Sequence, residues 1–435
     1  MKQWLVVLVV LVGPGAWCLV PGVAYAQETL QLGELVDAAL ASDPRTAQVE
    51  LLERASALRQ RNVSAQWRPA VGLEAQAQAQ SDAVEASFRG PDGRPVFSAS
   101  RQTYDSYLRV EQRLFDRGIG IQGDLERTQL AEQQARVRAA VYAVRQQVNE
   151  AFFAALTLEQ RARVLQAALA ELEARLREAQ ARVEQGTALA ADAAAVEATL
   201  LERRQAEDEV QSNRRAALAR LAAITGRQIP REATLAVPDL AARAAHVTTG
   251  SSQQLRPEYQ LFASTRMRLA VQQALAGAQG QPRVSAFMRA GVGRPGLNFA
   301  EHDTQAYALG GVRLQWNAWN WGTPQREREA LALQQQITAA DQDYFSRQLA
   351  EGAAVDTEAI ARLQRAVEGD ARIVALREQV ERTAGARMQE GVLTASDYLA
   401  RNAELLQARV AQATHRIELE EARARLLTRA GVEVR

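Results

Sequence analysis

Residues 137–183 read VRAAVYAVRQQVNEAFFAALTLEQRARVLQAALAELEARLREAQARV, and this stretch decides the fold of the chain. Its apolar residues recur in alternating steps of four and three, which is the heptad spacing of a coiled-coil seam. The seam residues are Val137, Val141, Val144, Val148, Ala151, Ala155, Leu158, Ala162, Leu165, Leu169, Leu172, Leu176, Ala179 and Val183. Because no proline interrupts residues 118–185, one helix there would reach about 100 Å at 1.5 Å per residue. A chain of 435 residues cannot bury such a rod in a globule, so we expect an elongated, mainly helical molecule.

The second half of the chain repeats the plan of the first. Gly118 is followed after 68 residues by Gly186, and Gly322 is followed after 69 residues by Gly391. In each half a helix and two strand-like segments precede the long helix, and a further helix follows it. We therefore expect a first repeat at 27–226, a linker or small middle segment at 227–255, and a second repeat at 256–435. The expected long helices are 118–185 and 190–226 in the first repeat, and 322–390 and 394–430 in the second.

Four segments alternate apolar and polar residues, which is the pattern of a strand with two different faces. They lie at about 70–80, 103–115, 283–293 and 306–319. Each is long enough to cross a bilayer as a tilted strand, which takes about 9–11 residues. Charges on the polar face suit a water-filled lumen, so the segments fit a membrane barrel. Two amphipathic hairpins on a soluble core explain the alternation equally well.

In the membrane interpretation, the two faces have different surroundings. The residues expected to face lipid are Leu108, Val110, Val284, Met288, Val312, Leu314 and Trp316. The residues expected to line the barrel lumen are Arg109, Glu111, Arg113, Arg289, Arg313 and Gln315. The aromatic residues near the strand ends have two interpretations. They form either an interfacial belt, which we favour for Trp316, or a packed junction with the helices, which we favour for Trp319.

The first 26 residues have the features of a cleaved secretory signal peptide. Lys2 precedes an uncharged apolar run at 5–12, and Ala24-Tyr25-Ala26 fits a small-residue cleavage site. The apolar run is too short for a membrane-spanning helix, which needs about 20 residues. Trp17 stands before Cys18, where lipid attachment normally requires a small residue, so we expect Cys18 to be removed rather than lipidated.

The composition argues against several function classes. Lys and Arg total 52 and Asp and Glu total 51, so the chain lacks the basic excess of a nucleic-acid binder. The 3 histidines lie far apart and there is 1 cysteine, which leaves no thiol-based metal cluster and no disulfide framework. The sequence has no Walker A loop, no G-x-S-x-G motif and no H-E-x-x-H motif. We expect neither an enzyme nor a bound cofactor or metal.

Taken in order, these features resemble the TolC-like outer membrane efflux protein family over nearly the whole chain after the signal peptide. The resemblance is carried by Asp43-Pro44 and by the strand exits at 115–118 (FDRG) and 316–322 (WNAWNWG). It is also carried by the glycine-centred turns at 183–189 (VEQGTAL) and 388–394 (MQEGVLT). No single motif is decisive, but the matched spacing in both halves is specific.

The resemblance implies a mainly α fold with a small membrane β-part. In that family, three chains form a 12-stranded barrel in the outer membrane above a long α-helical tunnel through the periplasm. The implied function is a passive exit duct in a tripartite efflux or type I secretion system. The implied partners are a periplasmic adaptor, an inner-membrane pump of the RND, ABC or MFS class, and the lipid of the outer membrane. The cargo and the class of pump do not follow from the sequence.

The strand count independently favours a trimer. Four strands cannot close a barrel, because about eight is the smallest number seen. An open sheet edge in lipid would leave backbone groups without hydrogen bonds. Three chains supply twelve strands, and cyclic symmetry closes the ring. The alternative function is a periplasmic coiled-coil adaptor or scaffold, which would need no barrel.

The resemblance assigns roles to the two glycine turns. Adaptor docking is implied for Gly186, Thr187, Leu189, Gly391, Val392 and Leu393. A periplasmic constriction is implied for Asp192 and Asp397, although T-x-x-D at 394–397 is also a capping box that needs no gate role. Residues at family latch positions differ here, because they are Met388, Leu393 and Ala400. We therefore expect the closed state to be held in another way, by apolar contact.

Overall fold

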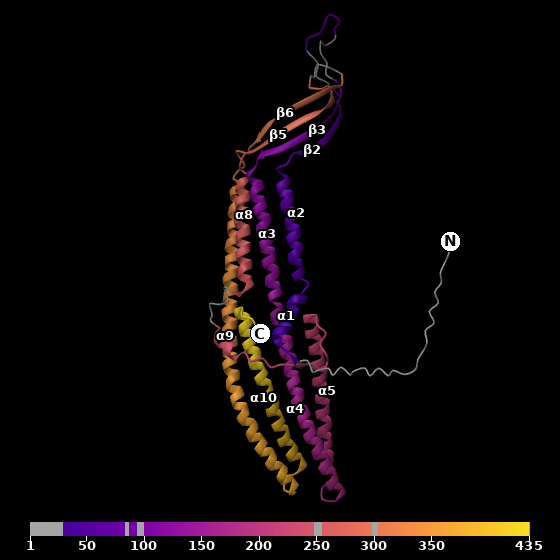
Figure 1. Cartoon of the computed structure of the whole chain (residues 1–435), viewed down its shortest axis with the longest axis vertical. Coiled ribbons are helices and arrows are strands. Elements are labelled where there is room, and N and C mark those ends of the chain that lie inside the picture. Colours follow the sequence, from indigo (N-terminus) through magenta and orange to yellow (C-terminus); the bar gives the residue numbers. More distant parts are fainter. Residues whose placement is uncertain (1–28, 83–86, 94–99, 248–254, 298–302, 435) are drawn as a thin grey trace, which may run out of the picture.

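The chain folds into one long rod of helices with a small sheet at one end (Figure 1). The computed structural model describes residues 29–82, 87–93, 100–247, 255–297 and 303–434. The expected signal peptide at 1–26 and Cys18 lie outside these residues. No helix in the described part is both long enough and apolar enough to cross a membrane.

The sheet has four antiparallel strands in the order β2-β3-β5-β6. These are β2 (Ala70–Ala79), β3 (Gln102–Phe115), β5 (Arg283–Arg294) and β6 (Gln305–Gln315). The last strand ends four residues before the expected end at Trp319, which is a correction to the sequence-based prediction. Gln315 pairs with Arg283, and the next residue opposite would be Pro282, which has no N–H for the ladder. Positive φ angles at Trp321 and Gly322 then turn the chain away from strand geometry.

Helices from both repeats run side by side beneath the sheet. The upper half contains α2 (Thr46–Ala65), α3 (Arg117–Tyr142), α8 (Pro257–Ala278) and the first part of α9 (Thr323–Gln389). The lower half contains α4 (Val144–Glu184), α5 (Ala190–Thr225), the rest of α9 and α10 (Ala395–Ala430). Figure 1 shows the α4–α5 and α9–α10 turns together at the far end from the sheet.

The helix expected at 118–185 is interrupted at one residue, Ala143, so it forms α3 and α4. The backbone there stays right-handed, with φ −62° and ψ −21°, which keeps the two helices in line. The interruption lies next to Tyr142, whose hydroxyl donates to the Thr428 carbonyl of α10 at 2.6 Å. Every residue of the predicted seam is buried or half-buried.

The largest apolar core lies at the middle of the rod. Phe152 and Phe153 of α4 are fully buried there, with ring centroids 5.4 Å apart in an edge-to-face arrangement. Around them pack α1 (Leu32–Ser42), β1 (Thr29–Leu30), β4 (Thr234–Leu235) and Leu240, which precedes the short helix α6 (Ala241–Ala245). The described part of the segment at 227–255 therefore contributes to a packed middle layer, where β1 and β4 pair in parallel.

Two buried carboxylates fasten this middle layer to the long helices. Glu159 of α4 accepts a hydrogen bond from the Leu235 backbone N–H at 3.2 Å. Glu420 of α10 accepts one from the Leu240 backbone N–H at 3.0 Å. Arg214 of α5 lies 3.4 Å from Glu159 and also donates to the Ala233 carbonyl at 2.5 Å. The layer is thus bonded to helices of both repeats.

Candidate functional site

The two helical turns at the far end have the same backbone construction. Gly186 and Gly391 have φ of 70° and 76°, in the left-handed region that side chains disfavour. The N–H of Thr187 donates to the Arg182 carbonyl at 2.9 Å, and the N–H of Val392 donates to the Arg387 carbonyl at 2.9 Å. These are the bonds of a Schellman motif, which ends a helix at a glycine.

The two turns lie against each other and enclose a cavity of about 420 Å³. Arg182 donates to the Gln389 carbonyl at 3.2 Å, and the Gln389 side chain donates to Glu178 at 3.0 Å. Leu189 is 71% exposed and Val392 is 72% exposed at its rim. The structure brings the other expected docking residues to the same place, although Leu393 is only half-buried rather than open to solvent.

The two aspartates near the turns have different surroundings. Asp397 belongs to the N-terminal cap of α10, because its N–H donates to the Thr394 hydroxyl oxygen at 3.1 Å and its carboxylate accepts from that hydroxyl at 2.7 Å. Asp192 lies in the first turn of α5 and lines the cavity between the turns. Capping thus accounts for Asp397 within one chain, and a constriction formed by both residues remains a prediction.

A buried polar group just inside the turns was missed by the sequence argument. Tyr398 of α10 is fully buried and its hydroxyl donates to Glu381 of α9 at 2.7 Å. The guanidinium of Arg175, from α4, lies 5.4 Å from the centre of the Tyr398 ring. Burial, followed by the hydrogen bond to Glu381, raises the pKa of Tyr398. Three helices from both repeats therefore meet in one polar contact, adjacent in sequence to Asp397.

A second carboxylate belongs to the same region. Burial, followed by the nearby charge of Glu381, raises the pKa of Glu171 on α4. Arg409 of α10 lies 3.9 Å from Glu171 and 2.9 Å from Glu378 of α9. Charged groups and the Tyr398 hydroxyl thus join α4, α9 and α10 beside the turns. Met388 and Leu393 line the cavity between the turns, and an apolar contact there that holds the closed state stays a prediction.

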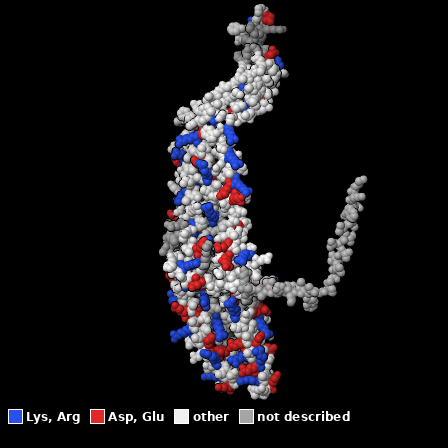
Figure 2. All heavy atoms as spheres, in the orientation of Figure 1, with Lys and Arg blue, Asp and Glu red and all other residues white. Residues whose placement is uncertain are grey.

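Strand register separates the two sets of sheet residues onto opposite faces. Val110 pairs with Met288, and Val284 pairs with Leu314, so these residues share the apolar face. Leu108 and Val312 belong to the same face by their pairing with Ala290 and Ala286. Figure 2 shows the sheet almost free of charged atoms on the visible side, above helices covered by both signs. Trp316 lies beyond the end of β6, where its indole N–H donates to the Gly280 carbonyl at 3.2 Å.

The other face of the sheet carries an ordered polar layer. Arg109 pairs with Arg289 across strands and forms an ion pair with Glu74 at 3.0 Å. Tyr307 donates to Asp105 at 2.6 Å, and Tyr107 donates to Glu74. Arg289 lies over the Tyr107 ring, and Arg313 lies over the Phe287 ring 4.9 Å from its centre. Glu111, Arg113 and Gln315 belong to this face by their register.

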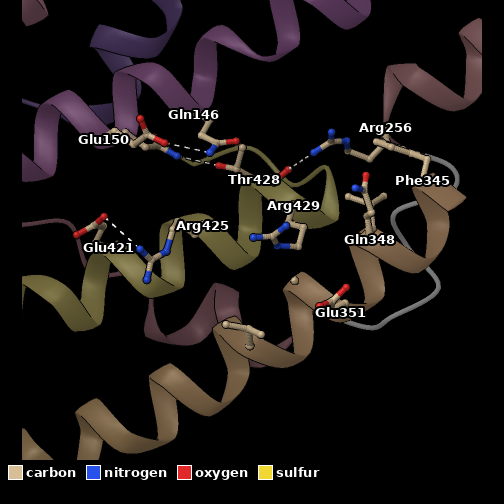
Figure 3. Close-up of a pocket in the computed structure, with 14 residues that line it drawn as sticks. Gln146, Glu150, Arg256, Phe345, Gln348, Glu351, Glu421, Arg425, Thr428 and Arg429 are labelled. Atoms are coloured by element: carbon tan, nitrogen blue, oxygen red, sulfur yellow. Dashed lines mark hydrogen bonds and ion pairs between the residues drawn. The ribbon is translucent and has the colours of Figure 1, made fainter.

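A third feature is a cavity of about 500 Å³ at the middle of the rod, between α4, α9 and α10 (Figure 3). Its arginines already have partners. Arg429 donates to Asp356 at 2.9 Å, Arg425 reaches Glu421 at 3.4 Å, and Arg256 donates to the Thr428 carbonyl at 3.2 Å. Across the described residues, no group of three or more His, Cys, Asp or Glu side chains has the arrangement of a metal site.

Comparison with known proteins gives a consistent result. The family model described as outer membrane efflux protein matches residues 35–227, which is the first repeat. A comparison with curated proteins found no match. Among solved structures, CusC, described in terms of transmembrane channel formation, has a TM-score of 0.72 at 14% identity, covering 92% of this chain and 92% of that chain.

Two further structures have the same fold. The outer membrane protein VceC of Vibrio cholerae has a TM-score of 0.67 at 17% identity, covering 92% of this chain and 96% of that chain. The open-state outer membrane channel MtrE of Neisseria gonorrhoeae has a TM-score of 0.66 at 16% identity, covering 92% of this chain and 89% of that chain. The chain thus matches the outer membrane efflux protein model through its first repeat and has the fold of these channels over both repeats.

Proposed function

We propose that this chain is the outer-membrane exit duct of a tripartite efflux or type I secretion system. The observation that carries the proposal is the sheet, whose apolar and charged side chains lie on opposite faces. A periplasmic adaptor or scaffold would have no use for such a sheet, and the family and the similar structures favour the channel. The duct is passive, and a partner pump supplies the energy.

The sheet supports assembly of three chains into one barrel. Its edge strands are β2 and β6, and each has one side without a partner strand in the described chain. The four strands alternate in direction, so β6 of one chain would meet β2 of the next in an antiparallel pair. Three chains would then form a closed ring of twelve strands, with the apolar face in outer-membrane lipid and the charged face around water.

The helices support the same ring. Exposed apolar side chains on α9 fall within an arc of about 60° at 100° per residue, which makes one straight stripe along the helix. The α9 stripe consists of Leu333, Ile337, Tyr344, Val355, Ile373, Leu376 and Val380. Figure 1 shows α9 at one edge of the rod and α2 and α5 at the other. Leu51 and Leu58 of α2 and Leu201 of α5 are also exposed, so the two edges fit each other head to tail.

The helical end then extends into the periplasm. Six turns from three chains would surround one mouth, and the exposed Leu189 and Val392 would offer an apolar surface to an adaptor. Asp192 and Asp397 would form rings of like charge at that mouth. The adaptor and an inner-membrane pump of the RND, ABC or MFS class complete the proposed assembly.

Fractionation of cells and planar-bilayer recording test this proposal together. We expect the protein in the outer membrane as a trimer that forms channels. Leu108→Arg should block insertion, because arginine facing lipid near the midplane costs about 2–4 kcal/mol. Arg109→Ala, on the adjacent residue, should assemble and change the conductance. Recovery of a soluble periplasmic monomer would contradict the proposal. If Leu108→Arg assembled normally and Arg109→Ala did not, the lipid and lumen faces of the sheet would have been assigned the wrong way round.

A further inference from the structure

The charged face of the sheet has an excess of arginine. In the register of the four strands, this face carries five arginines, namely Arg109, Arg113, Arg283, Arg289 and Arg313. It carries three carboxylates, namely Glu74, Asp105 and Glu111. Each chain therefore contributes a net positive charge to this face, although the whole protein is close to neutral.

Two of these arginines have no carboxylate partner among the described ion pairs. Arg289 lies over the Tyr107 ring at 5.0 Å, and its Nε is buried without a hydrogen-bond acceptor. Arg313 lies over the Phe287 ring at 4.9 Å. Stacking on an aromatic ring holds a guanidinium in place and leaves its N–H groups free to bind. The two side chains are thus positioned without being neutralised.

Register arranges the arginines in two tiers. Arg109 and Arg289 stand directly opposite each other on β3 and β5, which forms the first tier. Arg113 and Arg313 both pair with Ser285, from its two sides, which forms the second tier. Like charges at this spacing destabilise a sheet unless an opposite charge lies among them. Glu74 forms an ion pair with Arg109 at 3.0 Å, and Asp116 forms one with Arg113 at 3.6 Å. Arg289 and Arg313 are therefore the two tier arginines that can bind an outside anion.

We propose that the two arginine tiers bind anions, and that the duct conducts cargo carrying phosphate or carboxylate groups. The inference rests on the proposed function, in which this face lines the lumen. Planar guanidinium groups bind phosphate and carboxylate oxygens in pairs, which a point charge does not do. Three chains would contribute twelve tier arginines around one lumen, where a field of one sign concentrates the opposite ions.

The test is whether inositol hexakisphosphate blocks the current through single channels. The blocker is added on the side of the bilayer where the sheet lies, opposite the helical rod. Wild-type current should be blocked, and the double variant Arg289→Gln with Arg313→Gln should weaken the block by about tenfold or more. The variant Arg289→Lys with Arg313→Lys should be intermediate, because it keeps the charge and loses the paired hydrogen bonds. Glu111→Gln, on the same face, should strengthen the block.

Ion selectivity in a potassium chloride gradient gives a second readout. The chloride-to-potassium permeability ratio should fall in the double glutamine variant and rise in Glu111→Gln. Channels of normal conductance whose block and selectivity are the same in all variants would overturn the anion proposal and leave the exit duct intact. Block from the helical side alone would also overturn it, because the tiers lie at the other end. Failure of the wild type to form channels would instead refute the proposed function.

Discussion

Substitution of Ile337 by aspartate tests whether the α9 stripe joins neighbouring chains. Ile337 is 61% exposed in the single chain. Complete burial of such a side chain is worth about 1.5–3 kcal/mol, so the exposed share contributes about 1–2 kcal/mol at each contact. Three contacts in a ring would lose about 3–5 kcal/mol in Ile337→Asp, before the added cost of burying a carboxylate. We expect a trimer that dissociates at a clearly lower temperature.

The assay is thermal dissociation of the detergent-purified trimer, followed on native gels. Gln336→Asp is the matched control, because this exposed residue lies outside the stripe, about 100° from Ile337 around the same helix. The partner edge can be tested directly with cysteines at Leu333 and Leu58, which lie at similar depths below the sheet by residue count. A bifunctional maleimide should then link chains into trimers. Equal dissociation temperatures for both aspartate variants, with no crosslinked trimer, would refute the α9 stripe as the contact.

Three other predictions concern the helical turns. Tyr398→Phe should leave Glu381 buried without its donor, at a cost of about 1–3 kcal/mol, and should raise the open probability in bilayer recordings. Burial raises the pKa of Glu171 above its ordinary value of 4.5, so the folded protein favours the protonated carboxyl. The contribution of Glu171 to folded-state stability is therefore complete below pH 4.5 and is lost as the pH rises through its pKa in the folded protein. Protection of the turns from protease should therefore fall as the pH is raised above 4.5, and Glu171→Gln should flatten this dependence. A fall of the same size in both proteins would exclude Glu171. Leu189→Asp should abolish adaptor crosslinking and export without affecting the trimer, and unchanged export would place docking elsewhere.

The features that the sequence predicted correctly are the ones that depend on local spacing. A helix seam, a glycine turn and an alternating strand each arise from residues a few positions apart, and these are seen at 137–183, at Gly186 and Gly391, and in β2 and β3. The end of β6 was predicted four residues too late, because it depends on which residue stands opposite. That residue is Pro282, and it was unknown until the register of the β5–β6 hairpin was seen.

The contact of Tyr398 with Glu381 and Arg175 was missed for a related reason. These side chains come from α10, α9 and α4, and the residues lie more than 200 positions apart at the extremes. A tyrosine in a helix is ordinary by itself, and charged residues on long helices are mostly solvated. Only the packing of both repeats against each other shows that this group is buried. Family latch positions did not reveal it, because the contact uses other residues of the same helices.

The two repeats have the same plan but hold their turns differently, and this bears on how the duct opens. In the second repeat, α10 begins with a side-chain cap from Thr394 and soon afterwards buries Tyr398 against Glu381. In the first repeat, α5 begins at Leu189 with no side-chain cap. Moving α10 away from α9 would expose Glu381 and break its hydrogen bond. In the described part of the chain, the start of α5 has no comparable buried hydrogen bond to another helix. Six turns around one mouth would therefore be of two kinds, three firmly held and three loosely held. A partner that docks on the exposed Leu189 would act on the loosely held set, where a small gain in contact energy is enough to shift the equilibrium.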